Sequence, residues 1–239
     1  MRIDNMKPRI ETSFLSVEKD METIVTEIFK NERLKKLLFY NSKNALQRPN
    51  IDDIDSLRYP LKRYNEFTDT TEWFTITDSD VNIAQAELQK RLKDGWEQMS
   101  PTASLFMKNV KLVPKVKVNR EVDNYIVITF DNFLDNATNP EFRDNVISFD
   151  IVCHFDQWYL GDFKLRPYRI AAELDTMLNG RHLSGIGTLE FLGANQIVLN
   201  DEFGGLSLHF LAIHGEDDKV PHPDTPQFIK DEFEEMFGE

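Results

Sequence analysis

The stretch Val146-Ile147-Ser148-Phe149-Asp150-Ile151-Val152-Cys153 decides the fold. It is the longest largely apolar run in a region rich in β-branched and aromatic residues, which is typical of a buried strand. We therefore predict that it forms the central strand of a sheet. On an alternating strand, Asp150 would point to the solvent side. Cys153, the only cysteine of the chain, is expected to be a small buried core residue rather than a reactive thiol.

Other strand-like runs lie on both sides of this stretch. The first of these runs, residues 110–118, contains Pro114, which predicts a strand at a sheet edge or a bulge. The mostly polar, Pro-containing residues 132–145 predict an exposed hairpin loop before the central strand, and turns are expected at Ala194-Asn195 and Gly204-Gly205. The remaining predicted strands are residues 110–118, 125–130, 187–192, 196–199 and 206–213.

Apolar residues recur at helical spacing in three segments, which predicts a long helix at 17–39 and shorter helices at 81–93 and 168–178. The strands follow one another without crossover helices between most of them. Such an order predicts an α+β fold, with a largely antiparallel sheet and helices packed on one face.

Turn signals replace periodicity between residues 40 and 77, so this segment is predicted to be an irregular, extended insertion in a single α+β domain covering residues 1–215. Residues 216–239 form an acidic, Pro-containing tail that ends in a short amphipathic segment. We interpret this segment as a docking arm, since a helix so short needs a surface to lie on. The alternative, that it folds back onto its own domain, stays open.

The charge of the chain limits its partners. Against 28 basic side chains stand 41 acidic ones, giving a net charge of −13. An excess of this sign opposes binding to phosphate backbones and anionic membranes. The basic side chains form two small groups, Lys111/Lys115/Lys117 and Arg58/Lys62/Arg63. No window reaches the roughly 18 uncharged apolar residues of a membrane span, so no membrane partner is expected.

The motifs that carry catalysis or bind cofactors are missing from the sequence. The five histidines lack metal-ligand spacing, and neither Gly185-Ile186-Gly187 nor Gly204-Gly205 continues into a nucleotide-binding loop. We therefore expect no cofactor, no metal and no enzymatic activity. Asp131 and Asp150 keep a carboxylate-dependent hydrolase open as an alternative, beside a cytosolic adaptor that binds another protein.

Residues 125–215 resemble the tail-terminator, tail-completion and head–tail joining proteins of tailed bacteriophages. The resemblance is carried by the strand at 145–151, by the run from Arg166-Pro167-Tyr168-Arg169-Ile170-Ala171 to Asn179-Gly180, and by Gly185 to Phe191 with the closing strands. The predicted helix at 17–39 also matches how such chains begin. The chain departs from the pattern in its length, in the 50–110 region and in its apolar C-terminal segment.

The resemblance implies a structural virion protein, made in the host cytoplasm, that forms a sixfold or twelvefold ring in the neck of the phage. Such a ring caps the tail tube or joins it to the head, and it contacts portal or adaptor and tail-tube proteins. DNA would only pass through its lumen. The candidate interface residues come from the predicted hairpin loop and the tail: Asn132, Asn136, Pro140, Phe228, Ile229, Phe233, Met236 and Phe237.

Overall fold

The computed structural model of the chain describes residues 17–65, 67–68, 70–112, 123–135, 143–161 and 163–214. Within them, a five-stranded sheet in the order β4-β5-β6-β10-β9 packs against helices, which confirms the predicted α+β class. All of its pairings are antiparallel except the short one between β4 and β5. The strands are β4 (Val110–Lys111), β5 (Asn124–Asp135), β6 (Arg143–His154), β9 (Glu190–Val198) and β10 (Phe203–His214).

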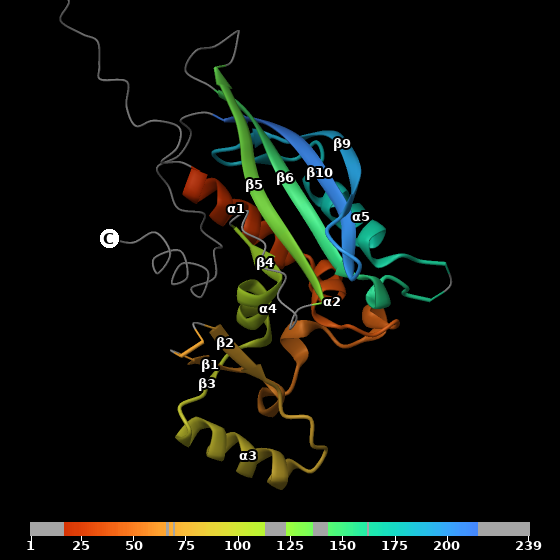
Figure 1. Cartoon of the computed structure of the whole chain (residues 1–239). Coiled ribbons are helices and arrows are strands. Elements are labelled where there is room, and N and C mark those ends of the chain that lie inside the picture. Colours follow the sequence, from red (N-terminus) through yellow and green to blue (C-terminus); the bar gives the residue numbers. More distant parts are fainter. Residues whose placement is uncertain are drawn as a thin grey trace, which may run out of the picture.

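The predicted central strand is β6, which lies in the middle of this sheet. Ile147, Phe149, Ile151 and Cys153 alternate along it and are fully buried on the face that the helices cover. Each such side chain contributes on the order of 1.5–3 kcal/mol when it leaves water. The covering helices are α1 (Val17–Lys30), α2 (Glu32–Phe39), α4 (Pro101–Asn109) and α5 (Arg166–Leu178) (Figure 1).

The prediction of a single helix at 17–39 is wrong, because the helix is interrupted at Asn31. Asn31 has an extended backbone, and its side-chain oxygen accepts hydrogen bonds from the amides of Arg33 and Leu34. An asparagine that caps these amides competes with the continuing helix and starts a new one. The apolar periodicity runs through the break and therefore conceals it.

The segment predicted to be irregular contains regular structure. It holds the 3-10 turns η1 (Ala45–Gln47), η2 (Ile51–Asp53) and η3 (Ser56–Arg58) and the hairpin β1 (Leu61–Asn65) and β2 (Thr70–Phe74). With β3 (Glu97–Gln98) the hairpin makes a small sheet that packs on α3 (Val81–Lys93), the helix predicted at 81–93. Figure 1 shows this small sheet and α3 at the far end of the molecule from the large sheet. The buried side chains of this second core are Leu61, Ile76, Ala84, Leu88 and Trp96.

Both predicted turns in the last third of the chain are wrong. Ala194-Asn195 lies inside the continuous strand β9, and Gly204-Gly205 lies inside β10. The real turn is at residues 199–202, where the side chain of Asn200 accepts the amides of Glu202 and Phe203. The predicted strand at 187–192 is divided between β8 (Gly187–Thr188), which pairs with β7 (His182–Leu183), and β9.

Helix α4 was not predicted, and it lies directly before the predicted strand at 110–118. Ser100 caps it by accepting the amide of Ala103, and Pro101 occupies its first turn. Only Val110–Lys111 pairs as a strand, and residues 113–118 lie outside the described part of the chain. The predicted hairpin loop is shorter than expected, since β5 and β6 pair as far as Asp135 and Arg143.

Candidate functional site

A buried arginine anchors the loop that follows α2. Arg166, at the start of α5, is fully buried and donates hydrogen bonds to the carbonyl oxygens of Leu37, Tyr40, Ser42 and Gln157 over 2.5–3.0 Å. Burial lowers the pKa of the guanidinium below its usual value. Two of these carbonyls, Leu37 and Tyr40, belong to the end of α2, where a helix leaves its last carbonyls without partners. The role of Arg166 is structural.

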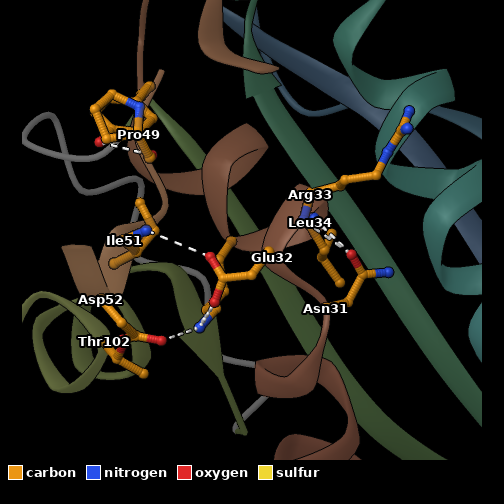
Figure 2. Close-up of polar contacts among 10 residues, drawn as sticks. Asn31, Glu32, Arg33, Leu34, Pro49, Ile51, Asp52 and Thr102 are labelled. Carbon is orange, nitrogen blue, oxygen red and sulfur yellow. Dashed lines mark hydrogen bonds and ion pairs between the residues drawn. The ribbon is translucent and has the colours of Figure 1, made fainter. Parts of the chain in front are cut away.

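A polar junction joins α2 to η2 and α4 (Figure 2). The buried ammonium of Lys35 contacts Glu32 and lies 2.7 Å from a carboxylate oxygen of Asp52. The hydroxyl of Thr102 donates to the same carboxylate, and the amide of Ile51 donates to Glu32. Burial alone would raise the pKa of Asp52, but the hydrogen bonds from Lys35 and Thr102 lower it below its ordinary value. The junction holds the 3-10 turn η2 against α2 and α4.

Strand β9 forms one edge of the large sheet, and among the described residues it pairs only with β10. An edge strand presents unpaired amide and carbonyl groups to which another strand can bind. Apolar side chains are exposed along this edge and in the turn after it. They are Phe191 (41% exposed), Leu192 (55%), Val198 (71%) and Leu199 (44%).

Two aromatic tips project from the surface. A small hairpin after β6 is closed by the bridge between Tyr159 and Leu165, and it carries Phe163 fully exposed with a positive φ of 61°. A bulky residue in this region of backbone space is strained, and strain of this kind accumulates at functional positions. At the tip of the β1–β2 hairpin, Phe67 is fully exposed and Tyr64 is largely exposed.

A network of polar side chains lies on the face of the large sheet opposite the helices. The hydroxyl of Ser148 is 2.9 Å from Nδ1 of His209 and 3.4 Å from Asp131, and the hydroxyl of Ser207 is 2.5 Å from Asp150. Asp150 lies on this face, opposite the covered core, and is half-buried. In the described contacts, both carboxylates reach His209 only through a serine. This order differs from a nucleophile–histidine–acid arrangement, in which the acid orients the imidazole directly.

No three histidine, cysteine or acidic side chains gather at metal-binding distance in the part of the chain that the structure describes. Cys153 is buried on the core face as predicted, and burial raises the pKa of its thiol to about 12. None of the described helices combines the length and the apolar composition that crossing a bilayer requires.

Of the predicted interface residues, the structure places only Asn132, in the strand β5 and not in a loop. The others lie outside the described residues: Asn136, Pro140, Phe228, Ile229, Phe233, Met236 and Phe237. The exposed apolar side chains on β9 and at the two aromatic tips are candidate interface residues that the sequence did not reveal. Exposed Phe and Leu read as core in a sequence, since only the fold shows which side of a strand is covered.

One known protein family has a model that matches this chain. The model of the YomW family matches residues 82–211, which is more than half of the chain and runs from α3 into β10. The chain belongs to the YomW family. The matched region contains α4, α5 and almost all of the large sheet, and it begins after the N-terminal helices, β1 and β2. No curated protein matches the chain.

Proposed function

We propose that this YomW-family chain is a structural virion protein that forms a ring in the neck of a tailed bacteriophage, where it caps the tail tube or joins it to the head. The observation that carries the proposal is the edge strand β9, with exposed apolar side chains along it. A subunit whose function is assembly needs a surface to which another copy can bind, and an exposed edge strand offers one.

The edge of β9 suits a head-to-tail contact between copies. Contacts of this type close into a ring when the rotation between subunits divides a full turn, and strand addition supplies main-chain hydrogen bonds across them. The aromatic tips at Phe163 and Phe67 add anchors of the kind that dominate protein interfaces. The net charge of −13 supports the same proposal, because an acidic lumen lets DNA pass without binding it.

The experiment disrupts the edge without touching the core. The variant L192K/V198K places two ammonium groups on β9, and V81K/I83K is the matched control on α3, where the replaced side chains are similarly exposed (55% for both Leu192 and Ile83). Light scattering after size exclusion measures the mass of the wild type and both variants, and negative-stain electron microscopy shows whether rings form.

We expect rings from the wild type and from V81K/I83K, and monomers from L192K/V198K with an unchanged circular dichroism spectrum. Antibodies against the chain should then label the junction between head and tail of the phage particles that contain it. A wild type that remains monomeric at all concentrations would favour the adaptor alternative. Rings whose antibodies label no neck would refute the virion assignment.

A further inference from the structure

The large sheet has a second open edge, on the side away from β9. Strand β4 lies beside β5 there, but its last residue, Lys111, pairs with Val127. From residue 128 to residue 135, β5 pairs with β6 alone in the part of the chain that the structure describes. Figure 1 shows this half of β5 at the opposite side of the sheet from β9. Each copy therefore has two open edges of similar length, residues 128–135 on β5 and residues 190–198 on β9.

The two edges run in opposite directions. Strands β5, β6, β10 and β9 are neighbours in this order, and each is antiparallel to the next. With an even number of alternating strands, the first and the last are antiparallel to each other. When a second copy stands beside the first in the same orientation, its β5 is therefore antiparallel to β9 of the first copy. Antiparallel pairing is also how the long strands of this sheet already bind one another.

We propose that β9 of one copy pairs antiparallel with residues 128–135 of β5 in the next copy, with Val198 opposite Ile128. The inference rests on the proposed function, since it names the edge to which β9 binds in the ring. The pairings within one copy set this register. Val198 pairs with Gly204, and the ladders through β6 place it level with Asn124 of its own β5. A shift from residue 124 to residue 128 moves it just past the part of β5 that β4 covers.

This shift of four residues keeps the side-chain faces aligned, because it is even, whereas an odd shift would turn every side chain to the wrong face. Val198 is 71% exposed in the single chain, and the pairing places it against Ile128, which is fully buried in the helix-covered core. On the other face, Asn195 lies opposite Asp131, and both are exposed. The amide of one side chain can then donate to the carboxylate of the other.

The same shift suits a closed ring. Four residues along a strand advance by about 13 Å, and the four long strands of one copy are about 19 Å wide. Copies at equal height around a ring must then tilt their strands by roughly 35° from the ring axis. Strands in closed barrels tilt by about 35–45°, so the register is compatible with closure.

The rival arrangement is a two-fold pairing of β9 with β9 of a second copy. Strands related by a two-fold axis are also antiparallel, so direction alone does not decide between the two. A two-fold dimer leaves residues 128–135 of both copies open, whereas head-to-tail pairing covers both edges of every copy in the ring. Coverage is favoured because an open edge binds further chains.

The test joins the two edges by a disulfide. N195C and D131C are made as separate variants, and within one chain these positions lie about 14 Å or more apart across the sheet, beyond the roughly 7 Å between the Cα atoms of a disulfide. Cys153 is fully buried and remains in place. The two variants are mixed, oxidised with diamide and separated on non-reducing gels. In the matched control, K90C on the exposed side of α3 replaces D131C.

We expect linked dimers from N195C mixed with D131C, at least about tenfold more than from the K90C mixture or from either variant alone, because a disulfide needs adjacent Cα atoms. N195C mixed with T129C should link less, since Thr129 lies two residues out of register. The double variant N195C/D131C should give a ladder of linked chains that ends at the number of subunits in the ring. Circular dichroism of each variant should match that of wild type.

Two results would overturn the inference and leave the neck proposal standing. One is wild-type rings in which N195C and D131C do not link. The other is rings in which N195C links to N195C, which would assign β9 to a two-fold contact. Monomers at all concentrations would overturn both proposals. Strong links between N195C and D131C in rings whose antibodies label no neck would support the edge pairing and refute only the virion assignment.

Discussion

At the scale of single residues, two positions show what a sequence conceals. Gly204-Gly205 reads as a turn, yet Gly205 lies inside β10. A glycine is needed at this position because the backbone of β6 approaches it too closely for a side chain. A Cβ added at Gly205 would lie 1.8 Å from the carbonyl oxygen of Ile151. Arg166-Pro167 reads correctly as the start of a helix, but nothing local shows that the guanidinium turns inward to carbonyls some 125 residues away in the chain.

The variant G205A should lower the free energy of unfolding by about 2–3 kcal/mol, since the strands must separate to admit a methyl group. Urea denaturation, monitored by tryptophan fluorescence, measures this change in the free energy of unfolding. G193A is the matched control, because Gly193 lies on β9 and a Cβ there meets nothing within 4 Å. The control should be unchanged or slightly more stable. Equal stability of the two variants would contradict the close approach at Gly205.

The variant R166M should destabilise the chain by at least about 3 kcal/mol, because four carbonyl oxygens around this buried guanidinium lose a charged donor together. Thermal unfolding by circular dichroism measures the loss. K164M, two residues away on the exposed hairpin, controls for the exchange of a cation for methionine. If R166M unfolds like K164M, the arginine does not anchor the loop after α2.

At the scale of elements, the sequence predicted those whose side chains follow one period from end to end. Strand β6, the helices at α3 and α5 and the antiparallel order were all confirmed. Elements set by a single side chain or by pairing were missed: Asn31 divides a helix whose apolar pattern continues through it, and β1 and β2 exist only as parts of one small sheet. The edge of β9 is likewise invisible in the sequence, since strand order determines which strand lies outermost.

Placing a charge in the middle of β6 should abolish folding. In I151D a carboxylate would occupy a fully buried site between β5 and β10, a cost beyond about 4 kcal/mol. Soluble yield and circular dichroism measure the effect. V198D, on the exposed side of β9, should remain folded with stability within about 0.5 kcal/mol of wild type. Soluble, folded I151D would contradict the central position of this strand.

The junction between α2, η2 and α4 should make stability depend on pH. The pKa of Asp52 is lowered in the folded state, so its carboxylate stabilises the fold above the unfolded pKa of 3.8. This contribution disappears as the pH falls through the lower folded value. D52N should therefore be less stable than wild type at pH 7, by less than about 1 kcal/mol because Asp52 is partly exposed, and the difference should shrink below pH 4. D53N, which alters the adjacent exposed carboxylate, controls for charge. A difference that grows with acidity would contradict the assignment.

At the scale of the whole molecule, the helix-covered core of the large sheet and the small core beside α3 are separate clusters of buried side chains. The small core has five buried side chains, so it should open at a lower free energy than the large sheet. Hydrogen–deuterium exchange should show the amides of β1 and α3 exchanging before those of β6 and β10. W96A should accelerate exchange in the small sheet alone, since Trp96 packs within it under the guanidinium groups of Arg63 and Arg91. Uniform exchange across both cores would show that they unfold together.

The pairing of β6 with β10 also determines the order in which the chain can fold. Arg143 pairs with His214 and His154 with Phe203, so every contact of this ladder closes a loop that contains η4 (Phe155–Gln157), α5 and three strands. Loops of this length close slowly, whereas β5 and β6 are neighbours in sequence and can pair early. A chain leaving the ribosome carries β6 with one edge of unpaired amide and carbonyl groups until residues 203–214 emerge. During that interval the edge is open to aggregation, and the yield of folded protein should depend on chaperones and on the rate of translation.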